Sequence, residues 1–387
     1  MVDKADLRTA PQVDFPESRM EALIAVWRRS VGSSTKSRTE ALSEKELDAM
    51  ARAVLRLQRG LTGSRELAGS SYMDDPELLG AYLLYYWPSS YAQAKRALSV
   101  AGIAPKRVLD LGSGPGPMAA AALDAGAVSI RLIDKSEKAL KLALDILEPA
   151  DVRTERHDLE NLPAGEPSDR FDLAIIGHAL NELAQGREDR IERRADVAIK
   201  AAGMLAPGGS ILMLDPATLA ASRDALALRD RLVASGWTVL APCSTQAPCP
   251  ALGAGPNQSC HDEAAWNPPR TVRELAERAG LDRASVKMSW FALMPPDNTD
   301  AEPCHDGPEA YRVVSEAMLN KAGRVRRLIC GPRGRFPLSA RNGDPAAVRA
   351  GFFSLERYEL LSIDNPEERE GGWGIAADTV LARGALP

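Results

Sequence analysis

Five cysteines are the residues of this chain best suited to metal chemistry. All of them lie after residue 242, at Cys243, Cys249, Cys260, Cys304 and Cys330. Prolines at 242, 248, 250 and 256 break the segment that holds the first three, and its apolar residues follow neither a helical nor a strand period. Core cysteines would lie on apolar faces, so these three are expected to be loop thiols. Loop thiols gathered in this way are typical ligands of a soft metal ion or an iron–sulfur cluster.

The spacing leaves the identity of the metal open. A tetrahedral set needs a fourth ligand, and either Cys304 or Cys330 could supply it. Zinc sites usually contain two cysteines separated by two to four residues, and the sequence has no such pair, so the wide spacing favours a cluster. His261 and His305 each follow a cysteine and keep a mixed cysteine–histidine zinc site as an alternative. A catalytic thiol is a third interpretation, although no cysteine stands apart with a clear base.

A glycine turn is the second motif with chemical potential. It reads Gly112-Ser113-Gly114-Pro115-Gly116, after a short apolar strand and before an alanine-rich helix. Glycines let the backbone approach a ligand and leave helix N–H groups pointing at it. The spacing differs from the Gly-x-Gly-x-x-Gly of dinucleotide-binding proteins. Asp134 closes the next expected strand, where an acid would accept hydrogen bonds from ribose hydroxyls. A nicotinamide-binding sheet, or one that binds no nucleotide, is the alternative.

The elements that must position these residues follow two patterns. Residues 16–100 are expected to be helical, with one helix beginning at a capping box of Ser43 and Glu46 and another, over 77–98, interrupted near Pro88. From residue 107 short apolar strands alternate with helices, which predicts a parallel sheet covered on both faces. Strands are expected at 108–111, 129–133, 152–156, 171–176, 210–214, 237–240 and 286–294. A helix over 309–322 and short strands over 352–380 follow.

The glycine turn resembles the first motif of class I S-adenosylmethionine-dependent methyltransferases, in which an acid, here Asp110, precedes Gly-x-Gly-x-Gly. The resemblance covers about residues 107–214 and includes Leu205-Ala206-Pro207-Gly208-Gly209 before the fifth strand. It implies that S-adenosylmethionine is the cofactor. It places Gly112, Gly114 and Gly116 on the methionine and ribose side, Asp134 at the ribose and Asp158 near the adenine.

Three polar residues after the fourth strand are candidates to line the substrate site: His178, Asn181 and Glu182. Methyltransferases place substrate-facing residues at this point, but the Asn-Pro-Pro-Tyr tetrad of many base-methylating enzymes is absent. The alternative is that Asn181 and Glu182 merely open a helix. The sequence assigns no catalytic residue.

A basic run lies near the C-terminal end of the chain. Seven Lys and Arg residues, and no acid, lie between Lys321 and Arg341. Such a run can neutralise phosphates, and arginine suits bidentate phosphate contacts. The alternative is a solvated strand face. The candidates for RNA contact are Arg324, Arg326, Arg327, Arg333 and Arg335.

The cysteine pattern and the basic run together resemble a narrower family, the ribosomal small-subunit methyltransferase-like proteins of mitochondria and bacteria. The matching segments are Pro242-Cys243-x5-Cys249-Pro250, Cys260-His261 and residues 324–334 around Cys330. This resemblance implies a [4Fe–4S] cluster on Cys243, Cys249, Cys260 and Cys330, S-adenosylmethionine binding, and a role on small-subunit ribosomal RNA during assembly. Cys304 would then be a spare thiol. The chain departs from the family where Ser244-Thr245-Gln246 replaces a frequent histidine.

The expected fold class is α/β, with a class I methyltransferase (Rossmann-like) parallel sheet, a helical N-terminal extension and a small C-terminal β appendage. The predicted domains are 1–100, 101–296 with a cysteine-rich insertion at 241–268, and 297–387. The predicted function is a methyltransferase-like protein that acts on small-subunit ribosomal RNA or in subunit assembly. The alternatives are a non-catalytic RNA-binding assembly factor and a zinc-containing small-molecule methyltransferase.

The bulk composition fits this prediction. A hydrophobic fraction of 45% with 26% charged residues is ordinary for a globular protein, and the net charge of −5 argues against a surface coated with positive charge. No run approaches the roughly 18 apolar residues of a membrane helix, and the first residues lack an apolar signal region, so we expect a cytoplasmic protein. The oligomeric state does not follow from the sequence.

Overall fold

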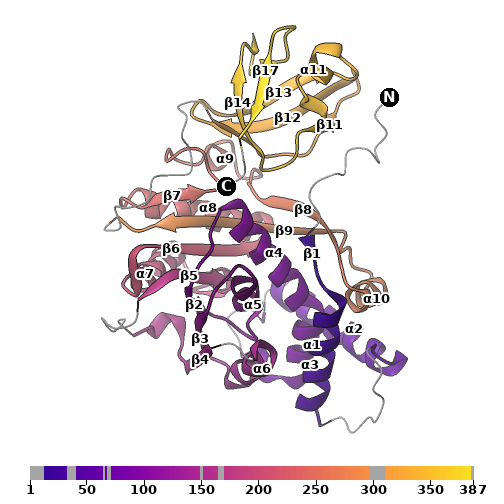
Figure 1. The fold of residues 1–387 in the computed structure, drawn as a ribbon, viewed down its shortest axis with the longest axis vertical. Helices are drawn as coiled ribbons and strands as arrows, with labels where there is room; N and C mark the ends of the chain where they lie inside the picture. Colours follow the sequence, from indigo (N-terminus) through magenta and orange to yellow (C-terminus); the bar gives the residue numbers. More distant parts are fainter. Residues whose placement is uncertain are drawn as a thin grey trace.

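The computed structural model describes residues 13–32, 41–63, 66–67, 71–148, 151–163, 170–296 and 310–384. Two β-sheets organise them (Figure 1). Helices cover the first sheet, and the second sheet lies beyond the edge of the first that carries β7 and β8, at the top of the view in Figure 1. Cys304 and His305 lie outside the described residues.

The first sheet has nine strands. Its parallel part runs in the order β4-β3-β2-β5-β6, and β9 pairs antiparallel with β6. β7 and β8 share the other edge of β9, and β1 pairs with β8. The strands are β1 (Val13–Asp14), β2 (Arg107–Leu111), β3 (Ser129–Asp134), β4 (Asp151–Arg156), β5 (Phe171–Gly177), β6 (Leu205–Pro216), β7 (Thr238–Ala241), β8 (Asp262–Asn267) and β9 (Ser285–Met294). An antiparallel strand inserted beside the fifth parallel one is the class I methyltransferase order, and the predicted fold class is confirmed.

The helices that follow the strands cover both faces of this sheet. They are α5 (Pro117–Asp124), α6 (Glu137–Leu147), α7 (Arg190–Ala202), α8 (Leu219–Val233), α9 (Pro250–Gly253) and α10 (Arg270–Ala279), with short turns η4 (Leu159–Asn161) and η5 (Leu180–Glu182). β8 lies within the segment that was predicted to be a cysteine-rich insertion at 241–268. Its six residues alternate poorly in polarity, so the sequence pattern alone does not reveal the strand.

The N-terminal helices pack in one hydrophobic core with the first sheet. They are α1 (Glu17–Ser30), α2 (Glu44–Gln58), η1 (Arg59–Gly63), η2 (Tyr72–Asp74), α3 (Pro76–Ala81), η3 (Tyr82–Tyr86) and α4 (Trp87–Val100). Ser43 and Glu46 form the predicted capping box of α2. The α-helix predicted over 77–98 is interrupted near Pro88 as predicted: α3 ends at Ala81, the π-helical η3 follows, and Pro88 lies in the first turn of α4. Trp87 Nε1 donates to the carbonyl of Pro115 at 2.9 Å, which anchors α4 on the glycine turn.

The second sheet comprises β10 (Tyr311–Val313), β11 (Met318–Leu319), β12 (Arg324–Gly331), β13 (Gly334–Arg341), β14 (Leu360–Asp364), β15 (Glu367–Arg369), β16 (Gly372–Gly374) and β17 (Val380–Arg383), with α11 (Pro345–Arg349) and η6 (Phe352–Ser354). The helix predicted over 309–322 is wrong in the described part of that range. Tyr311, Arg312 and Val313 are all buried between β12 and β14, which hides the strand period. The predicted domain boundaries at residues 100 and 296 stay predictions.

Candidate functional site

A cleft of about 690 Å³ opens at the carboxyl ends of the parallel strands. Ligands of open α/β sheets bind in this position, and the volume lies in the range of small-molecule sites. Most of the residues predicted for the cofactor and the substrate line this one cleft. They are Gly112, Gly114, Asp134, Asp158, His178, Asn181 and Glu182.

The glycine turn and Asp134 form one rigid unit at the base of the cleft. Asp134 accepts hydrogen bonds from the backbone N–H groups of Gly114 and Ser136, both at 2.8 Å. Gly112, Gly114 and Gly116 all have positive φ, of 69°, 51° and 75°. A Cβ on Gly112 would lie 2.5 Å from Cβ of Ala179, so the turn touches the substrate-side loop directly. Only glycine fits that position.

Asp110 and Gly116 support the turn from below and do not line the cleft. Asp110 is fully buried, accepts from the N–H of Ala119 at 3.1 Å, and its other oxygen has no partner in the described part of the chain. Burial raises the pKa of Asp110 to about 8. Gly116 precedes α5, and a Cβ there would meet Cδ1 of Leu147 at 3.0 Å. These two residues therefore shape the turn without reaching a ligand.

His178 takes an unusual conformation for its residue type, with φ of 58° at the end of β5. Its Nε2 lies 2.7 Å from Oε1 of Gln93, and Gln93 Nε2 donates to the carbonyl of Lys287 at 2.9 Å. The amide of Gln93 is thereby oriented, so Nε2 of His178 must carry the proton. Burial, helped by Arg283, lowers the pKa of His178 to about 4. Its Nδ1 is therefore a buried lone-pair acceptor without a hydrogen-bond partner among the described residues.

Asn181 and Glu182 form the short turn η5 and are held by the protein itself. Asn181 Nδ2 donates to the carbonyl of His178 at 2.8 Å, and its backbone N–H donates to Asp215 at 3.2 Å. Glu182 accepts from the hydroxyl of Tyr72 at 3.2 Å, a bond that ties η2 across the cleft. The alternative, that Asn181 and Glu182 merely open a helix, holds only in part, because both residues lie in a single 3₁₀ turn.

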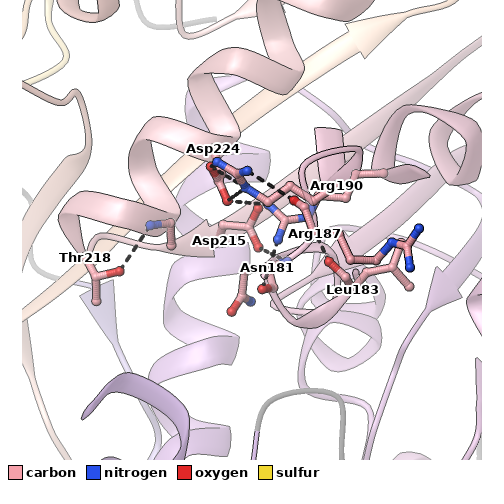
Figure 2. A network of polar contacts seen from close by, with 9 residues as sticks. Asn181, Leu183, Arg187, Arg190, Asp215, Thr218 and Asp224 are labelled. Atoms are coloured by element: carbon pink, nitrogen blue, oxygen red, sulfur yellow. Dashed lines mark hydrogen bonds and ion pairs between the residues drawn. The ribbon is translucent and has the colours of Figure 1, made fainter. Parts of the chain in front are cut away.

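A buried arginine that sequence reasoning missed fastens this loop; Figure 2 labels three of the residues it contacts, Asn181, Leu183 and Asp224. Arg194, on α7, is 3% exposed and donates to the carbonyls of Asn181 and Leu183, each at 3.2 Å. The same guanidinium pairs with Asp224 at 2.9 Å, and Arg190 pairs with the other side of that carboxylate. Its i+4 spacing from Arg190 is the only signal in the sequence.

Aromatic residues of the N-terminal helices form the wall opposite the sheet. Tyr82, Tyr85 and Tyr86 line the cleft, and Tyr82 stacks on Tyr86 with ring centroids 6.0 Å apart. Arg283 lies over the rings of Tyr85 and Tyr86, at 4.5 and 5.0 Å from their centroids. The helical region is therefore part of the site. Because these side chains come from segments about 200 residues apart, local sequence patterns could not bring them together.

The four described cysteines line a second, smaller cavity of about 40 Å³. Cys243 and Cys249 come from the loop between β7 and α9, Cys260 precedes β8, and Cys330 lies near the end of β12 in the second sheet. Arg229 holds the cysteine loop through the carbonyls of Thr245 and Ala247. The structure thus brings Cys330 to the three loop thiols, although 70 residues separate it from Cys260.

Other contacts join the two sheets around this cavity. Arg312 donates to the carbonyls of Pro242 at 2.8 Å and Tyr358 at 2.6 Å. Ser244 donates to the carbonyl of Cys330 at 3.1 Å. The cavity therefore lies at the junction between the cysteine loop and the strand that carries the basic run.

The donor set fits a thiolate-ligated cluster. Arg229, Arg312 and Arg335 line the cavity, and its lining, as far as the structure describes it, contains no histidine or carboxylate. Burial raises the pKa of all four thiols, that of Cys243 to about 12. A metal centre would supply the positive charge that converts them to thiolates, and the arginines would offset a cluster's net negative charge.

The described residues do not offer a site for a single metal ion, because no group of three Cys, His, Asp or Glu side chains among them is placed to hold one. A four-iron cluster is larger than one ion, so its ligands lie farther apart. His261 does not line the cavity, so the described residues do not form the mixed cysteine–histidine zinc site that the sequence left open.

The arginines of the basic run between Lys321 and Arg341 differ in their burial and in their contacts. Arg327 is 3% exposed and donates to the carbonyl of Phe353, so it cannot present its charge to RNA as predicted. Arg335 lines the cysteine cavity, and Arg333 pairs with Glu368 and lies over Trp373. Arg324 is half-buried and Arg326 exposed.

Comparison with known proteins identifies the family. Residues 77–339, more than half of the chain, match the family described as mitochondrial small ribosomal subunit Rsm22. The chain belongs to this family. None of the curated proteins matches the chain. The family's name refers to mitochondria, which differs from the predicted cytoplasmic location, and the compartment of this Rsm22 family member stays a prediction. No helix in the described ranges is both long and apolar enough to cross a membrane.

Solved structures of methyltransferases are also similar to this Rsm22 family member. An S-adenosylmethionine-dependent methyltransferase from Mesorhizobium loti is 28% identical over 33% of this chain and 53% of its own, with a TM-score of 0.26. The N-methyltransferase NodS from Bradyrhizobium japonicum is 13% identical over 62% and 97%, with a TM-score of 0.35. TrmN from Thermus thermophilus is 20% identical over 54% and 52%, with a TM-score of 0.35. The chain spans about half the length of the first of these. The scores are low, so the fold assignment depends on the strand order.

Proposed function

We propose that this Rsm22 family member binds S-adenosylmethionine and acts on small-subunit ribosomal RNA or in assembly of the small subunit. We further propose that Cys243, Cys249, Cys260 and Cys330 hold a [4Fe–4S] cluster. The observation that carries the proposal is the single cleft in which the glycine turn, Asp134 and the 178–182 loop meet.

The cofactor would lie along the carboxyl ends of β2, β3 and β4. Gly112 and Gly114 would let the methionine and ribose approach the backbone, Asp134 would accept from the ribose hydroxyls, and Asp158 would lie near the adenine. Each carboxylate oxygen of Asp134 accepts one backbone bond and has further capacity to accept. Bound S-adenosylmethionine supplies an electrophilic methyl group. The chain's own contribution is to position an acceptor in line with it.

The far end of the cleft would hold the acceptor. His178 offers a neutral Nδ1 lone pair there, in a tautomer determined by Gln93. Tyr82 and Tyr86 offer flat apolar surface, and Arg283 brings a positive charge to the tyrosine wall. A lone-pair acceptor beside an aromatic wall suits a group with an N–H or O–H on a planar ring.

The cluster would have a structural role. Its proposed ligands come from the cysteine loop of the first sheet and from β12 of the second, so a bound cluster would cross-link the two. Arg312 and Ser244 already bridge the same junction, which supports a structural rather than a redox purpose.

One observation favours the alternative of an assembly factor that binds without transferring a methyl group. Asn181 and Glu182, two of the three substrate-side candidates, are engaged by His178, Asp215 and Tyr72. A site whose polar groups are satisfied internally has fewer left to activate an acceptor.

Two measurements test the proposal. Asp134→Asn should weaken S-adenosylmethionine binding about 10- to 100-fold by calorimetry, because a charge-assisted hydrogen bond contributes about 1.5–3 kcal/mol. Asp172→Asn is the control: Asp172 also accepts from two backbone N–H groups, those of Lys106 and Arg107, but at the opposite end of the sheet. Absence of binding to the unaltered protein, or equal loss in both variants, would contradict the proposed cofactor site. Methyl transfer from labelled cofactor to isolated small-subunit RNA then separates the enzyme from the assembly factor.

A further inference from the structure

The second sheet closes into a barrel whose strand order is informative. β10 pairs antiparallel with β12, β12 with β13, and β13 lies parallel to β16. β16 pairs antiparallel with β15, and β14, which leads into β15 through Asn365-Pro366, returns to pair antiparallel with β10. α11 lies between β13 and β14. If β14 and β15 are counted as one bent fourth strand, β10, β12 and β13 are the first three strands and β16 is the fifth. Their order around the barrel is then first, second, third, fifth, fourth, with α11 between the third and fourth strands. This is the five-stranded Greek-key order of an OB-type barrel.

OB-type barrels bind oligonucleotides on the outer face of their second and third strands. Those strands here are β12 and β13. Val325, Ile329, Leu338 and Ala340 point into the barrel core, so the alternate residues form the outer face. Its members are Arg324, Arg326, Leu328, Cys330, Arg335, Pro337, Ser339 and Arg341.

Three arginines occupy the end of this face away from the cysteines. Arg324 lies directly opposite Arg341, and Arg326 lies opposite Ser339, its neighbour on the same face. No hydrogen bond or ion pair of their side chains is found among the described residues, whereas Arg333 and Arg369 are paired with Glu368 and Glu367.

The arrangement is unfavourable for the free protein. Like charges directly opposite each other on antiparallel strands are destabilising, and within the part of the chain that the structure describes no ion pair joins Arg324 or Arg341 to an acid. In the neighbouring row, which holds Arg326 and Ser339, the register places Glu367 beyond Gly374, and Arg369 already engages this acid. Lys321, exposed in the loop between the first and second barrel strands, adds a fourth cation beside the row. A phosphate would remove the repulsion.

The chemistry of the face specifies the ligand further. Its residues include no aromatic ring, and Phe336 lies opposite Ile329 on the other face. Bases would therefore have no ring to stack on, and phosphates would be the groups that are contacted.

We propose that the outer face of β12–β13, through Arg324, Arg326 and Arg341, binds the phosphates of single-stranded RNA without base preference. This inference rests on the proposed function, and it names the surface and the class of ligand. Cys330 lies on the same face four residues from Arg326, or about 13 Å along the strand. The RNA-binding face of β12–β13 would thus begin beside the cluster. The cluster would fix the orientation of this face relative to the first sheet.

The test is an RNA-binding titration with the full chain purified without oxygen. The probe is a fluorescein-labelled 20-nucleotide poly(U), with anisotropy measured from 0.05 to 0.5 M KCl. Three phosphate contacts at about 0.7 per contact predict that Arg324→Ala/Arg326→Ala/Arg341→Ala flattens the slope of log K against log salt by about 2. At 0.1 M salt this corresponds to an affinity loss of about 100-fold.

The matched control removes three other exposed cations, with Lys45→Ala/Arg52→Ala/Arg349→Ala. It should change the affinity less than about threefold. The arginine variant should melt at the same temperature as the parent or higher, since it relieves repulsion. Unchanged affinity in the arginine variant, an equal loss in the control, or tighter binding of a duplex of the same length would overturn the inference.

Calorimetry with S-adenosylmethionine keeps the two proposals apart. The arginine variant should bind the cofactor as the parent does. If it does, but RNA binding is unaffected, this inference fails and the proposed function stands. If the parent binds RNA through these arginines but binds no cofactor, the proposed cofactor site fails and this inference stands.

Discussion

Arg194 is the residue whose loss should damage the cleft most without touching a ligand. Replacement by Met keeps the length and apolar stem of the side chain and removes the guanidinium. The carbonyls of Asn181 and Leu183 would lose this donor, and of the described residues paired with Asp224 only Arg190 would stay (Figure 2). An unsatisfied buried group costs about 1–3 kcal/mol, and removal of one partner of a buried ion pair about 3–5 kcal/mol. Because Arg190 still pairs with Asp224, we expect the lower end, about 3 kcal/mol.

Arg190→Met is the matched control in the same network. The Arg190 side chain is 38% exposed, and its removal leaves the Arg194–Asp224 pair intact. Partly exposed ion pairs contribute about 0–1 kcal/mol. Urea unfolding followed by tryptophan fluorescence gives the free energy of unfolding for both variants. Calorimetry gives their affinity for S-adenosylmethionine, which should fall more for Arg194→Met because the 181–183 loop loses its anchor.

The pH dependence of this difference provides an internal check. Burial raises the pKa of Asp215 to about 7, and the charge of Arg194 opposes that rise. A raised carboxyl pKa means that ionisation destabilises the fold, so the stability present below the unfolded pKa is lost as the pH rises from about 4 to about 7. Without Arg194 the folded pKa of Asp215 rises further, and the loss continues above pH 7. The stability gap to the parent should therefore widen above pH 7. Equal destabilisation by the two variants, or a gap independent of pH, would refute this reasoning.

Further predictions concern the glycine turn and the cysteines. Gly112→Ala should destabilise the protein by about 2–5 kcal/mol, because the new Cβ would lie 2.5 Å from Cβ of Ala179 in a backbone conformation with positive φ. Gly114→Ala should cost only about 1–2 kcal/mol, because its nearest neighbour, Cε of Met73, would lie at an ordinary contact distance of 3.5 Å. Comparable losses of stability in thermal unfolding of the two variants would contradict the proposed clash with Ala179. Cys330→Ser should lose the metal and destabilise the protein, while Cys304→Ser should not; equal loss of iron from both, or loss from Cys304→Ser alone, would overturn the ligand assignment.

Much of the proposed cofactor site could be predicted because it is local in the sequence. A strand, a glycine turn and a helix place Gly112 and Gly114 together, and parallel strands end at one edge of a sheet, which brings Asp134 to them. Cys330 was different. The spacing left it open with Cys304 as the fourth ligand, and only the family resemblance chose between them, because the strand that carries Cys330 belongs to another sheet.

The rest of the cleft depends on tertiary packing. Arg194 and Arg283 are ordinary helix and loop residues by sequence, and their roles arise from what they contact across the fold. The prediction that Arg327 in the basic run contacts RNA failed for a related reason. Strand alternation divides the run, so that Arg327 is buried in the barrel while Arg326 next to it is exposed. The predicted helix over 309–322 failed because β10 is buried on both faces and shows no alternation.

Metal and sulfide analysis of protein purified without oxygen tests the proposed cluster most directly. We expect about four iron and four acid-labile sulfide per chain, with a brown colour and broad absorbance near about 400 nm. We also expect both to be absent from Cys330→Ser. Stoichiometric zinc, or metal-free protein that still unfolds as one cooperative unit with the parent's stability, would contradict a cluster that joins the barrel to the first sheet.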